Sequence, residues 1–529
     1  MSASGRPANG ELWWQQGVVY QVYPRSFQDS DGDGIGDIRG TIQRLDYLEW
    51  LGVDALWLSP VFPSPMADFG YDVADYTDVD PMFGTLADLD ELIAELHRRR
   101  MRLLLDYVPN HTSDRHTWFL DARAARDAEH RDWYIWRDPA PGGGPPNDWQ
   151  SAFGGSAWEW HEATGQFYFH SFLKEQPDLN WDNLEVRRAM GDVLRFWLDR
   201  GVDGFRVDVL WILAKGPEIA ATGDGRPADG PSVTSPLAGD QDGVHEIIGE
   251  PRSITDAYED RVLIGEIYLP LERLIRYYGT DGSGVHLPFN FQLLLVDWQA
   301  AAVHEAVKRY EELLPADAWP NWVLGNHDKP RVASRLGAEQ ARVAAMLLLT
   351  LRGTPTLYYG DEIGMIDVAV PAAEQQDPQG LRGGESRDPQ RSPMRWQDGS
   401  AAGFTIGDPW LPIGGDVDEV NVAVQRDDPH SMLSLHRRLL DLRRREPALH
   451  SGEWHDLGRE AGAIAYERRH GERRFLVLLN LTGEAASLPA AAREVAGAIV
   501  AATRSDREGD RHAGEGSLAP DEGLVILLD

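Results

Sequence analysis

The stretch Gly204-Phe205-Arg206-Val207-Asp208 decides the fold, because an apolar run that predicts a buried strand ends there in an acid. Two later stretches repeat the pattern: Ile264-Gly265-Glu266 and Gly325-Asn326-His327-Asp328. Acids that follow separate parallel strands converge at the mouth of an α/β barrel. Carboxyl groups brought together in different surroundings can divide into a nucleophile and a proton donor.

Strands and helices alternate along the chain. Apolar segments predict strands at 18–23, 54–58, 102–108, 202–207, 262–267, 285–291, 322–325 and 354–359. Helical spacing of apolar residues separates most of them, for example from Ile42 to Leu51 before Gly52, and Thr85 to Asp88 resembles a capping box. This number of βα units predicts an α/β fold, a (β/α)8 TIM-type barrel.

Three segments interrupt the alternation. Residues 112–175 are rich in Trp, Gly and Pro and are too long for a βα loop, so they predict a small inserted domain. Residues 214–250 and 366–400 predict irregular excursions that can roof a site. Short strands with Gly-rich turns after 450 predict a C-terminal antiparallel β domain. We therefore assign 1–111 and 176–450 to the barrel, 112–175 to the inserted domain and 451–529 to the C-terminal domain.

The composition excludes several classes of partner. Among 529 residues, 51 Lys and Arg face 85 Asp and Glu, a formal net charge of −34. Such a surface repels phosphate backbones and anionic lipid, so we expect no nucleic acid or membrane partner. The chain has no cysteine, which excludes disulfides and thiol catalysis. Residues 1–10 lack an apolar run, which favours a cytoplasmic location for a monomer or homodimer.

A second candidate site is the loop Asp29-Ser30-Asp31-Gly32-Asp33-Gly34-Ile35-Gly36-Asp37. Alternating acids in a Gly-rich loop suit a hard, oxygen-binding cation, usually Ca²⁺. The twelfth position is Gly40 rather than Glu, so a signalling EF-hand is not expected. The alternative is an acidic turn that binds no ion. The glycine spacing does not form a dinucleotide-binding fingerprint.

Four blocks in order carry a family resemblance: 106–111 (Asp-Tyr-Val-Pro-Asn-His), 204–208, 265–266 and 326–328. With them, nearly the whole chain resembles the α-amylase superfamily, glycoside hydrolase family 13. A fifth block, Gln176-Pro177-Asp178-Leu179-Asn180, resembles the oligo-1,6-glucosidase and α-glucosidase branch.

The resemblance implies a role for each acid. Asp208 is expected to be the nucleophile, Glu266 the acid/base, and Asp328 the third acid, which grips the ring hydroxyls of the sugar. Arg206 points to the same face of its strand as Asp208 and would hold it ionised. The pKa of Glu266 should be raised by burial and by nearby carboxylates. A retaining mechanism then requires the two carboxyl groups to lie about 5–5.5 Å apart.

The resemblance also implies substrate and metal contacts. A sugar-binding pocket would be formed by two histidines, an acid and its tyrosine, an arginine that closes the non-reducing end, and two entrance aromatics: His111, His327, Asp68, Tyr71, Arg391, Phe153 and Phe172. A structural calcium would be bound by Asp29, Asp31, Asp33, the Ile35 carbonyl and Asp37. Taken singly, each residue has a structural alternative, such as a buried ion pair or a core histidine.

The expected activity is that of a retaining, exo-acting α-glucosidase that removes glucose from short α-glucosides, with possible transglucosylation. Val209 follows the nucleophile, and among relatives Val at this position tends to accompany α-1,6 activity. The first alternative is glucosyl transfer of the trehalose synthase or sucrose isomerase type. The remote alternative is a non-catalytic scaffold resembling a transporter heavy chain, which the intact triad and the lack of a membrane span disfavour.

Overall fold

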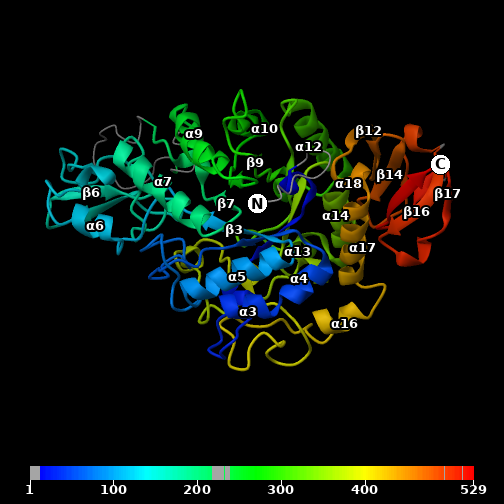
Figure 1. Cartoon of the computed structure of the whole chain (residues 1–529), viewed down its shortest axis with the longest axis horizontal. Helices are drawn as coiled ribbons and strands as arrows, with labels where there is room; N and C mark the ends of the chain where they lie inside the picture. The colour runs from blue at the N-terminus through cyan, green and yellow to red at the C-terminus, as the bar shows by residue number, and fades with distance from the viewer. Residues whose placement is uncertain (1–11, 217–231, 233–238, 494, 515) are drawn as a thin grey trace, which may run out of the picture.

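The computed structural model describes residues 12–216, 232, 239–493, 495–514 and 516–529, and its centre is a parallel sheet of eight strands (Figure 1). The strands follow the order β10-β11-β1-β2-β3-β7-β8-β9. This confirms the predicted (β/α)8 barrel. The strands are β1 Val19–Val22, β2 Ala55–Leu58, β3 Arg102–Tyr107, β7 Gly204–Val207, β8 Val262–Gly265, β9 Leu287–Pro288, β10 Asn321–Val323 and β11 Thr354–Tyr358.

The strand register places the acids side by side. Val207 on β7 pairs with Gly265 on β8, so Asp208 and Glu266 are each the first residue past neighbouring strands. On the other side of β7, Arg206 pairs with Asp106 of β3. Because side chains alternate along a strand, this register turns Arg206 and Asp106 to the same face.

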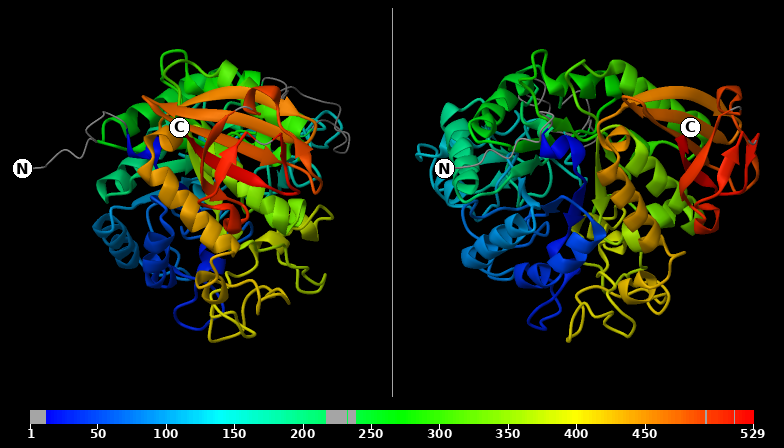
Figure 2. Two further views of the ribbon diagram at one scale, coloured as in Figure 1. Left: turned by 90° about the vertical axis from the view of Figure 1, so that its right-hand side faces the viewer. Right: turned by 45° about the vertical axis from the view of Figure 1, so that its right-hand side comes forward.

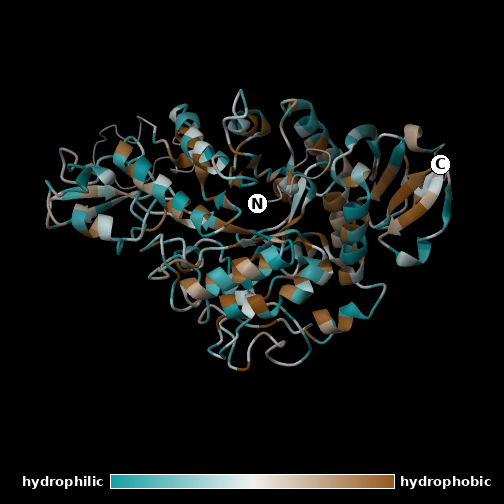
Figure 3. Cartoon of the chain, in the orientation of Figure 1, coloured by the Kyte–Doolittle hydropathy of each residue, from teal (hydrophilic) through white to brown (hydrophobic). Residues whose placement is uncertain are grey.

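Local sequence signals mark the start of one barrel helix and the end of another. Thr85 and Asp88 form the predicted capping box at the start of α5 (Leu86–Arg98). Hydrophobic and hydrophilic residues alternate along the helices in Figure 3, as expected of helices that bury one face. The helical run before Gly52 is two helices, α3 (Ile38–Gln43) and α4 (Leu45–Leu51), and Gly52 ends the second with φ 100°.

Residues 112–175 form a layer at one end of the long axis (Figure 1). They contain α6 (Thr117–Ala122) and an antiparallel sheet of β4 (Trp136–Arg137), β6 (Gln166–Phe169) and β5 (Trp158–His161). Trp158 and Phe169 pack edge to face at 5.1 Å in the small core of this layer. The exact boundaries of this segment stay a prediction.

The two excursions contain more helix than the sequence predicts. Helix α9 (Gly243–Asp256) begins inside the segment 214–250, because Val244, Ile247 and Ile248 bury one helical face against α7 (Leu184–Asp199). Residues 217–231 and 233–238 of that segment lie outside the described residues. The segment 366–400 contains only α15 (Pro378–Leu381) and the 3-10 turn η5 (Pro389–Arg391).

The C-terminal residues form an antiparallel sheet, as predicted, at the other end of the long axis (Figure 1). It packs beside α14 (Ala338–Thr350) and α17 (Met432–Arg445), as the turned views show (Figure 2). Its strands are, in spatial order, β12 Glu453–Glu460, β13 Ala463–His470, β14 Arg473–Asn480, β19 Gly523–Leu528, β16 Ala496–Ala502 and β17 Arg511–Ala513. Over the described part of the chain, no helix is long and apolar enough to span a bilayer.

Candidate active site

A cavity of about 310 Å³ opens at the carboxyl ends of the barrel strands. It brings together the three acids of the sequence analysis with most of the expected sugar contacts. The lining residues are Asp68, Tyr71, His111, Phe153, Phe172, Asp208, Val209, Trp211, Glu266, Tyr268, His327, Asp328, Lys329, Gln379 and Arg387.

Arg206 lies beneath the cavity and binds three carboxyl groups. Its Nη1 lies 2.7 Å from Asp106 Oδ1 and 2.7 Å from Asp208 Oδ1. Its Nη2 lies 2.7 Å from Glu266 Oε2. One planar guanidinium therefore fixes the two candidate reacting acids relative to each other, which suits the short carboxyl separation of about 5–5.5 Å that retention requires.

These acids share too little positive charge for all of them to ionise easily. Burial raises the pKa of Glu266 and the pKa of Asp208, while the Arg206 guanidinium opposes both shifts. Burial likewise raises the pKa of Asp106. The cluster as a whole can therefore retain a proton near neutral pH, as an acid/base pair needs.

Asp328 has the opposite environment. Its carboxylate lies 3.3 Å from Arg387 Nη1 and 3.1 Å from Arg391 Nη2. Although burial acts in the other direction, His327 and these two arginines hold the pKa of Asp328 well below its usual range. Burial lowers the pKa of His327 to about 3, so at neutral pH the ring is uncharged and the arginines supply the positive charge.

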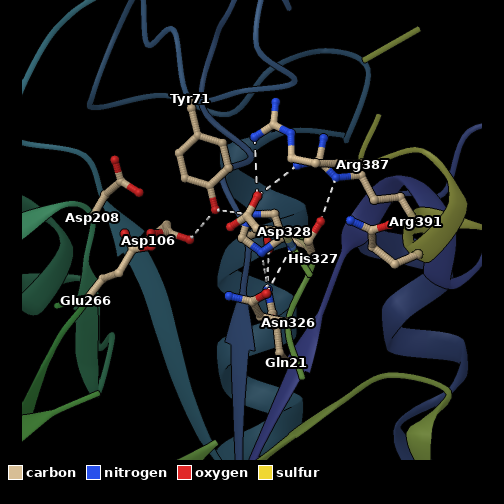
Figure 4. A network of polar contacts seen from close by, with 12 residues as sticks. Gln21, Tyr71, Asp106, Asp208, Glu266, Asn326, His327, Asp328, Arg387 and Arg391 are labelled. Atoms are coloured by element: carbon tan, nitrogen blue, oxygen red, sulfur yellow. Dashed lines mark hydrogen bonds and ion pairs between the residues drawn. The ribbon is translucent and has the colours of Figure 1, made fainter. Parts of the chain in front are cut away.

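His327 and Tyr71 link both sides of the cavity (Figure 4). Gln21 Nε2 donates to His327 Nδ1 at 2.8 Å, so the ring proton lies on Nε2, which faces the Tyr71 hydroxyl at 2.9 Å. The Tyr71 hydroxyl in turn donates to Asp106 Oδ2 at 3.1 Å. The two rings are parallel, with centroids 5.5 Å apart. These contacts leave little rotational freedom to either ring.

The fifth sequence block contributes a contact behind the pocket wall. Gln176 Nε2 lies 3.0 Å from His111 Nε2 and donates to Asp68 Oδ2 at 3.2 Å. His111 is fully buried, and burial lowers its pKa. Gln176 therefore orients two of the expected sugar-binding side chains at once.

Two aromatic rings stand at the cavity wall. Phe153 and Phe172 pack edge to face with centroids 5.6 Å apart. Phe172 also contacts the His111 ring at 5.3 Å, and the Arg387 guanidinium lies 5.1 Å above Phe153. Both rings come from residues 112–175, so that segment forms part of the wall.

Arg387 lines the cavity, whereas the sequence analysis expected Arg391 to close the pocket. Arg387 Nη2 lies 2.8 Å from Asp68 and 2.7 Å from Asp377, and Arg387 lines the cavity. Arg391 is 1% exposed and lies behind Asp328, where its Nε donates to the His327 carbonyl at 2.9 Å. Both arginines lie four positions apart in one irregular segment, and no local pattern distinguishes them.

Other lining residues had no assigned role in the sequence analysis. Tyr268 lies two residues past Glu266, and its ring is stacked on Phe291 at 4.2 Å. Trp211 packs edge to face against Tyr268 at 5.7 Å. The two-residue spacing from Glu266 could have identified Tyr268, but nothing local identifies Trp211, Lys329 or Gln379.

The acidic loop lies after β1, apart from the cavity-lining residues. Asp29, Asp31 and Asp37 each offer one oxygen, and the three oxygens lie within 4.8 Å of one another. Asp33 is outside this group; its Oδ1 accepts the Ile35 N–H at 2.8 Å. Burial opposes ionisation of Asp29, but hydrogen bonds from Thr405, Gly32 and Gly34 hold its pKa below the usual value.

The chain is similar in sequence and in structure to known carbohydrate-active enzymes. Residues 21–452 match the family model described as the α-amylase catalytic domain. The chain is 39% identical to oligo-1,6-glucosidase of Parageobacillus thermoglucosidasius, covering 89% of this chain and 91% of that protein. It is 39% identical, with the same coverage, to trehalose-6-phosphate hydrolase of Escherichia coli strain K12. The crystal structure of the α-glucosyl transfer enzyme XgtA is similar with a TM-score of 0.90 and 38% identity, covering 98% of this chain and all of that one.

Proposed function

The chain belongs to the α-amylase family, glycoside hydrolase family 13, and from this premise we propose that it is a retaining, exo-acting α-glucosidase. Its substrates would be short α-glucosides, cleaved from the non-reducing end through a covalent glucosyl-enzyme. Similarity to oligo-1,6-glucosidase over most of both chains supports the activity.

The observation that carries the exo-acting proposal is the ion pair between Arg387 and Asp68 at 2.8 Å. It joins two segments across one end of a cavity of about 310 Å³ that also contains Asp208 and Glu266. A pocket closed beyond the reacting acids admits one terminal sugar and leaves the aglycone toward the opening. An internal bond of a long polysaccharide cannot enter such a pocket.

The contacts of the acids suggest which oxygens react. Arg206 binds Asp208 through Oδ1, which leaves Oδ2 to attack the anomeric carbon. Glu266 is held through Oε2, which leaves Oε1 to donate a proton to the departing oxygen. Water activated by the same carboxylate would then release glucose with its original configuration. Asp328, held ionised, would accept hydrogen bonds from ring hydroxyls.

Glucosyl transfer is the second candidate, because the similar structure XgtA is titled an α-glucosyl transfer enzyme. Transfer uses the same acids and differs in the acceptor of the glucosyl group. The chain would then convert maltose, sucrose or trehalose into isomers or longer products instead of free glucose.

One experiment distinguishes hydrolysis from glucosyl transfer. Purified protein is incubated with maltose, isomaltose, sucrose and trehalose, and the products are resolved by chromatography and early proton NMR. Hydrolysis by the proposed route gives α-glucose first, because two displacements restore the configuration. Initial β-glucose from sucrose, whose one glucose residue is the one transferred, would refute retention, and isomerised disaccharides without free glucose would favour transfer.

We further propose that the acidic loop binds a structural Ca²⁺ through Asp29, Asp31 and Asp37. The donor set is all oxygen, as Ca²⁺ prefers. The loop is shaped for close contact: Gly34 has φ 91°, and a Cβ there would lie 2.0 Å from the Asp408 carbonyl oxygen. Asp33 and the Ile35 carbonyl stay predicted ligands. The cytoplasmic location, the monomeric or dimeric state and the α-1,6 preference also stay predictions.

A further inference from the structure

Val209, the residue after the proposed nucleophile, has a left-handed backbone with φ 38° and ψ 43°. Among the described non-glycine residues with positive φ, it is the single β-branched one. The left-handed region is strongly disfavoured for branched side chains, because Cβ and its substituents crowd the backbone. Such a conformation persists only where the surroundings impose it.

The surroundings of Val209 impose it from both sides. Before it, the Asp208 N–H donates to the Tyr107 carbonyl at 2.8 Å and extends the strand pairing. After it, the chain enters the 3-10 turn η2 (Leu210–Ile212), and the Ile212 N–H donates to the Val209 carbonyl at 3.2 Å. Leu210 is buried against Gly265, where a Cβ would lie 2.7 Å from Leu210 Cδ2. The change from strand to 3-10 turn therefore takes place at the single residue Val209.

The consequence of this turn is the direction of one N–H group. The Val209 N–H donates to Glu266 Oε2 at 2.8 Å. Arg206 Nη2 binds the same oxygen at 2.7 Å. An oxygen that accepts from two donors does not itself carry a proton, so these contacts reserve Oε1 for it.

We infer that Val209 is a positioning residue whose left-handed backbone aims its N–H at Glu266 Oε2, so that the proton of the acid/base lies on Oε1 toward the leaving group. The inference rests on the proposed function of Glu266. It concerns the backbone of Val209 and is independent of any effect of its side chain on linkage. The same N–H stabilises the carboxylate that forms once the proton has been donated.

The direct test replaces the Val209 amide with an ester, by cell-free translation with α-hydroxyisovaleric acid on a suppressor tRNA. This removes the N–H and keeps the side chain. A lost donor to the carboxylate raises the pKa of Glu266, so the basic limb of the pH profile of kcat/KM should move up by about one unit. Loss of orientation should lower kcat/KM for maltose about tenfold or more, with a smaller loss for 4-nitrophenyl α-glucoside, whose leaving group needs little protonation.

The matched control is the same ester at Val303 of α12 (Ala300–Leu313), which is not among the cavity-lining residues. It removes an N–H that donates to the Gln299 carbonyl at 2.9 Å and keeps the valine side chain. Its basic limb should coincide with that of the parent. An unmoved limb in the Val209 ester, or equal shifts in both esters, would overturn the inference. Absence of α-glucoside turnover in the parent protein would instead overturn the proposed function.

The backbone conformation has its own test in Val209→Gly and Val209→Ala. Gly normally destabilises a protein relative to Ala, but at positive φ the order reverses. Val209→Gly should therefore melt at the same or a higher temperature than Val209→Ala, and it should keep the parent basic limb because it keeps the N–H. A clearly lower melting temperature for Val209→Gly would contradict the imposed left-handed turn.

Discussion

Arg387 binds Asp68 at 2.8 Å across 319 positions of the chain, and this ion pair joins the segment 366–400 to the wall of the cavity. The same guanidinium binds Asp328 and Asp377. Three carboxylates thus depend on one buried cation, whereas Arg391 supports Asp328 from behind.

Arg387→Lys should lower kcat/KM strongly, because a single ammonium cannot reproduce the planar contacts with three carboxylates. Leaving a buried carboxylate unpaired costs about 3–5 kcal/mol, so we expect a loss of about 10²-fold or more together with a lower melting temperature. Steady-state kinetics well below the melting temperature measure the loss. Arg391→Lys is the matched control, and it should retain more activity because it leaves the Asp68 wall intact. A larger loss in Arg391→Lys would restore Arg391 as the closing arginine.

Glu266→Gln and Asp208→Asn should differ in their dependence on the leaving group. Glu266→Gln removes the proton donor, so kcat/KM for maltose should fall about 10²- to 10⁴-fold, with a much smaller fall for 4-nitrophenyl α-glucoside. Asp208→Asn should abolish turnover of both substrates, because an amide cannot form the glucosyl ester. The measurement is kcat/KM of each variant on maltose and on 4-nitrophenyl α-glucoside. Equal losses on both substrates in Glu266→Gln would contradict its role as the acid.

Calcium should stabilise the protein through the acidic loop. A cation that binds only the folded state at 100 times its dissociation constant adds about 2.7 kcal/mol to the free energy of unfolding. Chelation should therefore lower the melting temperature more than it lowers activity at low temperature. In Asp31→Ala, added calcium should raise the melting temperature, measured by calorimetry, much less than it does in the parent. Asp33→Ala tests whether Asp33 is also a ligand. If it is, calcium should stabilise this variant as little as it stabilises Asp31→Ala. If both variants respond to calcium like the parent, the loop is an ordinary turn.

Val209→Ala or Val209→Thr should raise activity on maltose relative to isomaltose. The Val209 side chain lines the cavity, so it can crowd one approach of the leaving sugar. A methyl-scale change in a pocket is worth about 1–3 kcal/mol, which limits the shift to roughly 10- to 200-fold. The ratio of the two kcat/KM values is the measure, because backbone effects on catalysis cancel in it. An unchanged ratio would place linkage choice elsewhere, first in the segment 214–250.

His436 should make stability depend on pH. Burial on α17 lowers its pKa to about 4, below the value of about 6.5 in an unfolded chain. Between these values the unfolded state binds more protons, so stability should fall as pH falls from about 6.5, by up to about 1.4 kcal/mol per unit. His436→Leu should show a smaller drop in melting temperature between pH 7.5 and pH 5. His470→Leu, which changes an exposed histidine, should keep the parent slope. Parallel curves for all three proteins would exclude His436 as a source.

Short-range patterns in the sequence determined the barrel and the position of its acids. A strand buried in a parallel sheet is a continuous apolar run in the sequence. The residue that follows such a strand lies at the carboxyl end of the barrel, so its position can be predicted from the local sequence. For that reason Asp208 and Glu266, each directly after its strand, and Asp328, five residues past β10, could be assigned to the same end of the barrel. The capping box at Thr85 is local in the same way.

Only the tertiary structure decided that Arg387 rather than Arg391 lines the cavity, and how the chain turns at Val209. Arg387 and Arg391 share one irregular segment, and the choice depends on a partner hundreds of residues away. A branched residue after a strand favours an extended backbone, yet Val209 is left-handed. The bonds and packing of its neighbours Asp208 and Leu210, together with the Ile212 N–H, hold it there. The periodicity of apolar residues predicts secondary structure and burial. Contacts between segments that are distant in the sequence produce no such pattern, so they cannot be predicted in this way.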